Sequence, residues 1–113
     1  MNYGIVTTDD FDREVKKLAK KYHSFLDDLE YFKKELLKNP LMGDDLGDNT
    51  RKVRMAIASK NKGKSGGARV ITYNVLIDIK NTDIYMLDIY DKSIIETISI
   101  AEIKKLKIKH GLI

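Results

Sequence analysis

The hydrophobic periodicity of the chain changes once, and this change most restricts the folds that are open to it. In the first forty residues, apolar side chains recur at the spacing of amphipathic helices. After residue 51 they alternate with polar ones, as in half-buried strands. Two helices followed by a run of strands indicate an α+β domain. The apolar residues at helical spacing are Phe11, Val15, Leu18, Ala19 and Tyr22, followed by Phe25, Leu29, Phe32 and Leu36.

Local signals set the expected ends of the two helices. Thr8 or Asp10 can cap the first helix, because short polar side chains accept a hydrogen bond from the free N–H groups there. Ser24 with Asp27 resembles a capping box for the second. Asn39-Pro40 ends it, since the residue before proline avoids the helical conformation. The two helices are therefore expected to form an αα-hairpin.

The expected order of elements is β-α-α-β-β-β-α. The last three strands are joined by connections too short for a crossover, so they predict an antiparallel meander. All helices are expected on one face, which gives a two-layer domain whose other sheet face is free. The expected strands are 2–8, 52–58, 68–79 and 84–90; 40–50 and 59–67 are expected as loops, 80–83 as a turn, and Ser99 with Glu102 as the capping box of a final helix.

Length and composition exclude several classes of protein. The 113 residues predict one domain, residues 1–113. The absence of cysteine excludes disulfides, thiol catalysis and cysteine-based metal sites. No apolar run approaches the ~20 residues of a membrane helix, and the first residues do not resemble a signal peptide. A cytoplasmic protein with no membrane partner is expected.

Charge is distributed unevenly along the chain. The net charge of +4 divides into −3 over residues 1–50, which hold eight basic and eleven acidic residues, and +7 over the remainder. A basic run of this kind is compatible with an ordinary solvated face and with contact to a polyanion. Residues 51–70 contain no acid and seven basic residues: Arg51, Lys52, Arg54, Lys60, Lys62, Lys64 and Arg69.

The two-residue period of a strand predicts which basic side chains share a face. If the sides of the three strands coincide, the free face carries one cationic patch with aromatic edges. Such a patch suits single-stranded RNA, with cations for phosphates and tyrosines for base stacking; an ordinary solvent-facing sheet is the alternative. The predicted sides are Lys52, Arg54 and Lys60; Arg69, Ile71 and Tyr73; and Asp88 and Tyr90, with Lys92 at the strand end.

Other chemistries find little support. Gly63-Lys64-Ser65-Gly66-Gly67 resembles a phosphate loop, but it lacks the first glycine of the Walker pattern and precedes a strand, so nucleotide hydrolysis is excluded. His23 is expected to be structural, and His110 is a weaker candidate that approaches the sheet from the final helix. No spacing of histidine and carboxylate residues supports a metal site.

Three segments carry a family resemblance. They are Lys-Ser-Gly-Gly-Ala-Arg-Val-Ile at 64–71, Ile-Tyr-Asp-Lys at 89–92 and Ser-Ile-Ala-Glu-Ile-Lys-Lys-Leu at 99–106. Together they resemble the RelE/ParE toxin superfamily, in its HigB-like branch. The resemblance covers the chain from Phe11 to the final helix and implies a RelE-like fold. Two positions depart from the pattern, where Thr72 and Ile98 stand in place of aromatic residues.

The resemblance implies a ribosome-dependent mRNA endonuclease, the toxin of a type II toxin–antitoxin module. In such enzymes the ribose 2′-OH attacks the neighbouring phosphate, so neither a metal nor a cofactor is expected. The implied partners are mRNA, the ribosome and a cognate antitoxin of helix-turn-helix type. Two alternatives remain open on the same fold: a ParE-like inhibitor of gyrase, and a member that binds RNA or the ribosome without cleaving.

The resemblance also implies roles for individual residues. Arg69 would hold the scissile phosphate and stabilise its developing charge. Lys52 and Arg54 match a basic pair on the first meander strand, although a guanidinium is a poor proton acceptor. Lys92 would assist the leaving oxygen. The expected RNA-binding residues are Lys60, Lys62, Lys64, Tyr73 and Tyr90.

Overall fold

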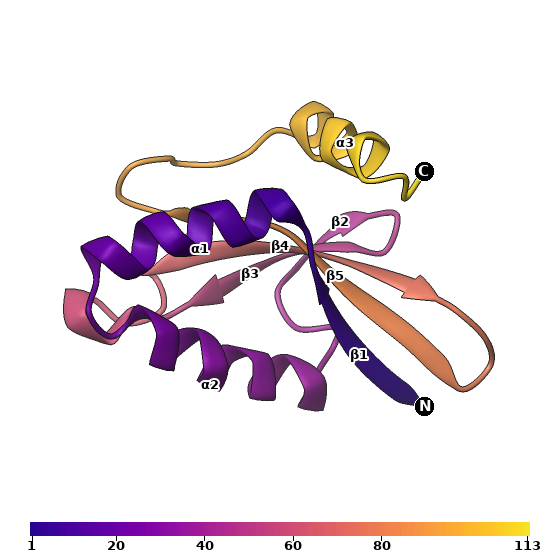
Figure 1. Ribbon diagram of the computed structural model, residues 1–113, viewed down its shortest axis with the longest axis horizontal. Helices are drawn as coiled ribbons and strands as arrows, with labels where there is room; N and C mark the ends of the chain where they lie inside the picture. Colours follow the sequence, from indigo (N-terminus) through magenta and orange to yellow (C-terminus); the bar gives the residue numbers. More distant parts are fainter.

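Five strands form one mixed sheet in the order β1-β5-β4-β3-β2, and three α-helices pack on it (Figure 1). The structure is a computed structural model that describes all residues from 1 to 113. The α+β class predicted from the sequence is confirmed. The elements are β1 (Asn2–Thr7), α1 (Asp9–Lys21), α2 (Phe25–Lys38), β2 (Asp44–Gly47), β3 (Thr50–Met55), a short 3-10 helix η1 (Ala58–Lys60), β4 (Ala68–Leu76), β5 (Asn81–Asp91) and α3 (Ile100–Lys109).

The predicted antiparallel meander is confirmed for β3, β4 and β5. The sheet is nevertheless mixed, because β1 pairs in parallel with β5 at one edge. The prediction of a loop over residues 40–50 is wrong, since β2 and β3 form a hairpin there. Its two turn residues, Asp48 and Asn49, have φ angles of 50° and 57°, as a tight type I′ hairpin turn requires.

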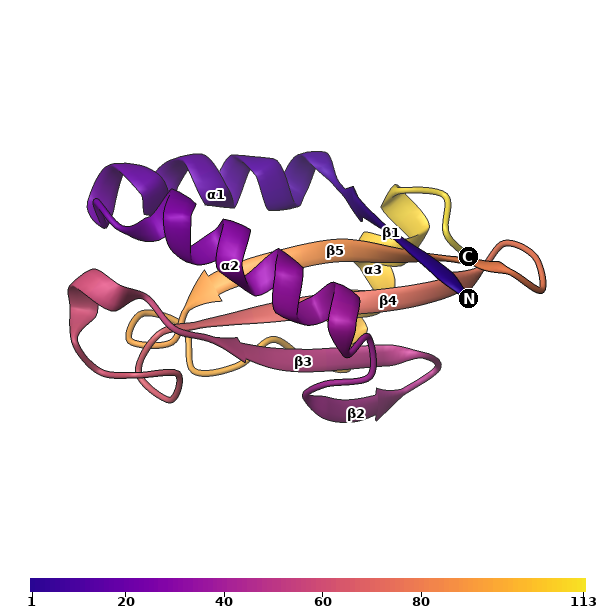
Figure 2. The same ribbon diagram turned by 90° about the horizontal axis from the view of Figure 1, so that it is seen from below.

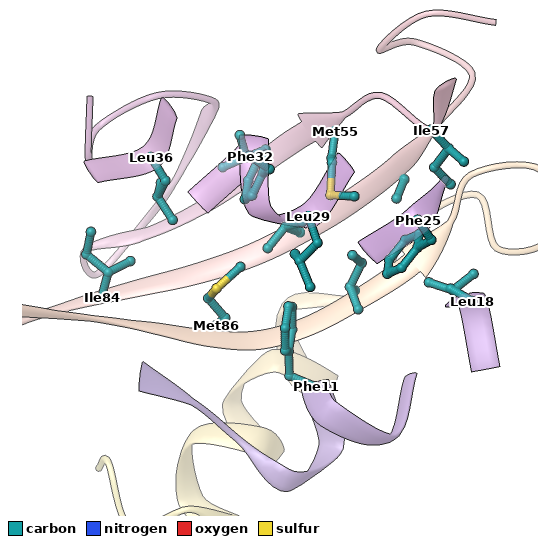
Figure 3. Packing of buried hydrophobic residues seen from close by; sticks show 14 residues of the cluster. Phe11, Leu18, Phe25, Leu29, Phe32, Leu36, Met55, Ile57, Ile84 and Met86 are labelled. Atoms are coloured by element: carbon teal, nitrogen blue, oxygen red, sulfur yellow. The ribbon is translucent and has the colours of Figure 1, made fainter. Parts of the chain in front are cut away.

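The larger core lies between the sheet and the first two helices. Phe11 of α1 and Phe25 and Phe32 of α2 are almost completely buried against side chains of the central strands (Figure 3). The residues that the sequence predicted for the buried stripes of α1 and α2 all contact this core. The strands contribute Val53, Met55, Ala68, Val70, Ile84, Met86 and Ile89.

Helix α3 lies on the opposite face of the sheet, so the prediction that all helices cover one face is wrong. Figure 2 shows α1 and α2 in front of the sheet and α3 behind it. The reason is that β4 is apolar on both faces: Val70 belongs to the larger core, while Ile71 forms a second cluster with Leu87 and Ile103 of α3. The domain therefore has three layers, and the second face of the sheet is only partly free.

Two of the three predicted helix caps are confirmed. The Thr8 hydroxyl accepts a hydrogen bond from the Phe11 N–H at 3.2 Å, and the Ser99 hydroxyl accepts one from the Glu102 N–H at 3.1 Å. The capping box predicted at Ser24 is wrong. Ser24 already has a helical conformation, and its hydroxyl donates to Asp28 Oδ2 at 2.7 Å instead.

Strand boundaries differ from the predicted ones near the turns. β3 ends at Met55 rather than at residue 58, because the chain turns into η1. The turn after β4 lies at 77–80 rather than at 80–83, so β5 begins earlier than predicted, at Asn81. No helix in the structure is both long and apolar enough to cross a bilayer.

Candidate nucleic-acid interface

One row of residues crosses the three central strands on the face that carries α3. Arg54 of β3 lies directly opposite Arg69 of β4, which in turn lies opposite Tyr90 of β5. Lys52 lies in the next row of the same face, opposite Ile71. The predicted convergence of Lys52, Arg54, Arg69 and Tyr90 on one side of the sheet is thus present in the structure.

Tyr90 belongs to the same buried cluster as Ile103 of α3, whereas Arg54 at the other end of the row is exposed. The contacts of α3 with the sheet also reach the opposite end of the strands, where Lys107 donates to the Thr50 hydroxyl and lies over the Tyr73 ring. Thr50 and Tyr73 face each other in the register, four residues along their strands from Arg54 and Arg69. At ~3.3 Å per residue, that separation is roughly 13 Å. One half of the face is therefore apolar and covered, and the other is basic.

Arg69 is a buried cation without a carboxylate partner. Its side chain donates to three backbone carbonyls, those of Lys64 at 3.2 Å, Ala68 at 3.2 Å and Ser65 at 3.0 Å. A guanidinium has five N–H donors, so two of them, including the one on Nε, have no protein acceptor. Only 7% of the residue is exposed. Burial first, and then the charge of Arg54, lower the pKa of Arg69.

The glycine-rich loop packs closely against the end of β3. The Arg69 side chain donates to two of its carbonyls, those of Lys64 and Ser65. A Cβ on Gly67 would approach the Met55 carbonyl oxygen to 2.1 Å, so only glycine fits there. The two lysines in the loop are both exposed. Lys64 forms an ion pair with Glu35 at 3.6 Å, and Lys62 forms none. Lys64 thus lies at the edge of β3, between Arg54 and Glu35 of α2, while Lys62 has no acidic partner.

A shallow hollow of about 420 Å³ adjoins the row. Lys52, Arg54 and Lys64 line it, together with the acidic Asp44. These three basic side chains come from β3 and from the loop before β4. The structure thus brings together five of the predicted site residues, Lys52, Arg54, Lys62, Lys64 and Arg69, around one end of the sheet.

Lys60 is placed differently from its prediction. It lies in η1, not on β3, so the prediction that it shares a strand side with Lys52 and Arg54 is wrong. Its Nζ donates to Asp91 Oδ1 at 2.7 Å and to Ser93 Oγ at 3.2 Å, and its side chain is 6% exposed. The charge of Lys60 is thus neutralised by an ion pair within the protein.

Asp91 is the centre of that buried cluster. Its carboxylate also accepts a hydrogen bond from the Tyr22 hydroxyl and pairs with Lys21 at 3.6 Å. Burial alone would raise the pKa of Asp91, but the hydrogen bonds from Lys60, Ser93 and Tyr22 outweigh it and hold the pKa well below its usual range. The cluster joins the end of β5 to α1 and to η1.

Neither predicted tyrosine offers a ring face for base stacking beside the basic row. Tyr90 is 3% exposed, and its hydroxyl lies beside Thr97 and Ile98 without forming a hydrogen bond of normal geometry. Burial raises the pKa of the Tyr90 hydroxyl. Tyr73 lies beneath Lys107, 4.1 Å from Nζ to the ring centroid, at the covered end of the face.

Lys92 follows β5 at the same end of the sheet as Arg69. Its backbone N–H donates to the Gly67 carbonyl at 3.1 Å, which ties the segment after β5 to the glycine-rich loop. Its Nζ donates to the Glu96 carbonyl at 2.9 Å and forms no ion pair. Lys92 therefore carries an uncompensated charge near the row of Arg54, Arg69 and Tyr90.

The two histidines lie away from this interface. His23 is exposed in the turn between α1 and α2. His110 follows α3, and its Nε2 lies 2.6 Å from Asp10 Oδ2 at the start of α1, so it does not reach the basic row. No group of three or more histidine and carboxylate side chains is arranged to hold a metal ion.

Sequence reasoning missed the buried charges of Asp91 and Lys107 and the partial burial of Asp88, which it had placed only by strand side. Lys107 had a readable signal, since it follows Ile103 by four residues and therefore lies on the apolar stripe of α3. Asp88 is partly buried next to a bulge in β5, where burial and the nearby Glu14 and Asp10 raise its pKa to about 6, although the Ile89 N–H opposes the shift. No local pattern marks it.

A scan of the sequence against models of protein families finds none that matches.

Proposed function

We propose that this protein is a ribosome-dependent mRNA endonuclease of the RelE/ParE type, and that Arg69 binds the scissile phosphate. The observation that carries the proposal is a buried guanidinium with free N–H donors and no carboxylate partner, directly opposite a second arginine. Like charges facing each other across two strands destabilise the sheet. An anion bound between Arg54 and Arg69 would remove that repulsion.

The chemistry of the proposed reaction requires few groups from the protein. The ribose 2′-oxygen loses its proton and attacks the adjacent phosphorus, and the bond from phosphorus to the 5′-oxygen breaks as that oxygen gains a proton. Negative charge grows on the phosphate oxygens in the transition state, where Arg69 and Arg54 would stabilise it. Lys52 and Lys92 are the remaining candidates for assisting the proton transfers.

The resemblance of residues 64–71, 89–92 and 99–106 to RelE/ParE toxins supports the same proposal. The resemblance also implies two partners, an antitoxin of helix-turn-helix type and the ribosome. A short open reading frame with a helix-turn-helix pattern next to this one, whose co-expression restores growth, would support the first partner.

The test is primer extension on an mRNA that is being translated in a reconstituted system. Wild-type protein is expected to cut the message only when ribosomes are present. Arg69→Ala should reduce cleavage at least ~100-fold, the order of loss when one group that stabilises transition-state charge is removed. Arg69→Lys, which keeps the charge but loses the planar fork, should retain only part of the activity. Arg13→Ala is the matched control, because Arg13 is exposed on α1 and far from the row.

Growth arrest on expression is combined with assays of mRNA cleavage and gyrase activity to separate this proposal from the alternatives. Unaltered toxicity of Arg69→Ala, with its fold intact by circular dichroism, would contradict the role given to Arg69. Inhibition of gyrase supercoiling with intact mRNA would instead assign the protein to the gyrase-inhibiting class. Ribosome binding without cleavage would identify a member that has lost catalysis.

A further inference from the structure

A second hollow, of about 380 Å³, lies between the β2–β3 hairpin and α3. It shares no lining residue with the hollow beside the basic row. Side chains of Leu46, Tyr73, Ile100 and Ile103 form apolar walls, and Lys104 and Lys107 are its basic residues. Its volume is in the range of small-molecule sites, at the lower end.

Lys107 is an unusual residue to find at the base of this hollow. It is 7% exposed, and its Nζ donates to the Thr50 hydroxyl at 2.6 Å. The same Nζ lies 4.1 Å from the centroid of the Tyr73 ring. An ammonium has three N–H donors, so the hydroxyl and the ring face leave one without a protein acceptor.

The charge on Lys107 has no ion-pair partner. Asp48, in the hairpin turn, is the acidic residue that acts on it through space, yet no carboxylate forms an ion pair with Nζ. The side chains of the lining include two lysines and one aspartate, and Ile113, whose α-carboxylate ends the sequence, lines the hollow as well. A buried ammonium is normally paired, because its desolvation is costly. Neither Asp48 nor the α-carboxylate of Ile113 forms an ion pair with Nζ, so that position is open to a negative group from outside the chain.

We propose that this hollow binds a small organic carboxylate, with the carboxylate on Lys107 and an apolar body against Leu46, Tyr73 and Ile100. A single buried donor group suits a monoanion better than a phosphate ester, which needs several donors around its oxygens. The apolar walls favour a hydrocarbon or aromatic body over a sugar. RNA does not fit, because its charged backbone would have to enter an apolar space.

The hairpin turn gives the site a firm second wall. Asp48 and Asn49 both have positive φ angles, and the Asn49 carbonyl accepts from the Asn74 N–H at 3.0 Å. The Thr50 hydroxyl accepts a hydrogen bond from Lys107 and donates one to the Asp48 carbonyl of the turn at 3.0 Å. Lys107 is thus held in place by groups that are themselves fixed, which favours a preformed site.

The probe for the test is naphthalene-2-carboxylate, and naphthalene-2-carboxamide is its neutral control of the same shape. Heteronuclear NMR titration of the full chain should show saturable shifts at residues 47–50 and 103–107. The carboxamide should bind at least about tenfold more weakly, since it lacks the charge that Lys107 neutralises. Lys107→Met should weaken binding of the carboxylate by at least about the same factor. Lys105→Met, on the same helix but outside this hollow, should leave it unchanged.

Three results would overturn the proposal: no saturable shifts up to about 10 mM probe, equal affinity for the acid and the amide, or full affinity in Lys107→Met. If Lys107→Met does not fold, Ile100→Trp serves instead, because Ile100 is 60% exposed at the mouth of the hollow and the larger ring should block entry. Tighter binding of a peptide through its C-terminal carboxylate, by more than about tenfold, would reassign the site to a protein partner. None of these results depends on RNA cleavage.

Discussion

Two buried cations at the same end of the sheet have opposite surroundings. Lys60 pairs with Asp91 at 2.7 Å, and that carboxylate accepts further bonds from Ser93 and Tyr22. Arg69, with similar burial, contacts only backbone carbonyls and faces the charge of Arg54. The first cation is neutralised by the chain itself, and the second is not.

The difference separates residues that hold the fold from residues that are available to a ligand. Lys60 and Arg69 were both predicted to contact RNA, because they belong to one basic run in the sequence. In the structure Lys60 joins η1 to β5 through Asp91, whereas Arg69 keeps a net charge and free N–H donors. A basic residue that lacks an internal counter-charge is the better candidate for binding a polyanion.

The largest expected effect is on the stability that the Lys60–Asp91 ion pair provides. Asp91→Asn leaves Lys60 buried without a carboxylate, so the free energy of unfolding should fall by ~3–5 kcal/mol. Urea denaturation measures it, and Asp83→Asn on the same strand, which forms no ion pair, is the control. A loss below about 1 kcal/mol would show that Lys60 is not held by this pair and would break the comparison.

Acid should remove the same stabilisation. The pKa of Asp91 is lowered in the folded state, so its contribution is complete above the unfolded-state pKa of 3.8 and is lost as the pH falls below that value. Wild-type stability should therefore decline steeply below pH 4, and that part of the decline should be absent in Asp91→Asn. Denaturation curves recorded across the acid range measure both.

A somewhat smaller effect is expected at Arg69, the cation without a counter-charge. Inorganic phosphate should stabilise the wild-type protein by ~2.7 kcal/mol when present at about one hundred times its dissociation constant. Arg69→Met should lose most of this gain, measured against its own stability without phosphate, because it lacks the guanidinium that would hold the anion. Thermal denaturation with and without phosphate measures both, with Arg51→Met as control. Equal stabilisation of the two proteins would place the anion elsewhere.

Asp88 provides the reverse case, a partly buried carboxylate without a cation. Its pKa is raised to about 6 in the folded state, against 3.8 unfolded. The charged form therefore destabilises the fold above pH 6, and this penalty disappears as the pH falls below 4. Asp88→Asn should raise the free energy of unfolding at pH 7 by ~1–2 kcal/mol, after allowance for partial exposure. The gain should vanish at pH 4, and its persistence there would refute the titration of Asp88 as the cause.

The smallest effect is expected at the exposed loop. Lys62→Ala should change the free energy of unfolding by no more than ~0.5 kcal/mol, since Lys62 is exposed and forms no ion pair. It should weaken RNA binding modestly and reduce the salt dependence of the affinity by about one phosphate contact. Filter binding over a range of salt concentrations tests this, and an unchanged slope would place Lys62 outside the RNA path.

Local signals account for what the sequence predicted well. Thr8 and Ser99 cap their helices through neighbouring N–H groups, and the two-residue period placed Lys52, Arg54 and Arg69 on one side. The β2–β3 hairpin was missed because its composition is that of a loop, although Asp48-Asn49 suits a type I′ turn. Here the turn chemistry was more informative than the composition.

Long-range contacts account for what the sequence could not predict. α3 docks on the second face through Ile103 and Ile71, which are separated by some thirty residues and have no pattern in common. The Lys60–Asp91 pair depends on η1 replacing the end of a strand, which moves Lys60 away from Arg54. Apolar residues on both faces of β4 were the one available indication that a helix packs on the second face of the sheet.

The parallel pairing of β1 with β5 also affects how the protein reaches its native state. Asn2 pairs with Asn81, and Thr7 with Met86, so the first strand finds its neighbour only after most of the chain has been made. Closing so large a segment slows folding. During synthesis from the N-terminus, β1 must wait unpaired beside α1 and α2. The sheet, and with it the row of Arg54, Arg69 and Tyr90, is completed only when β5 leaves the ribosome.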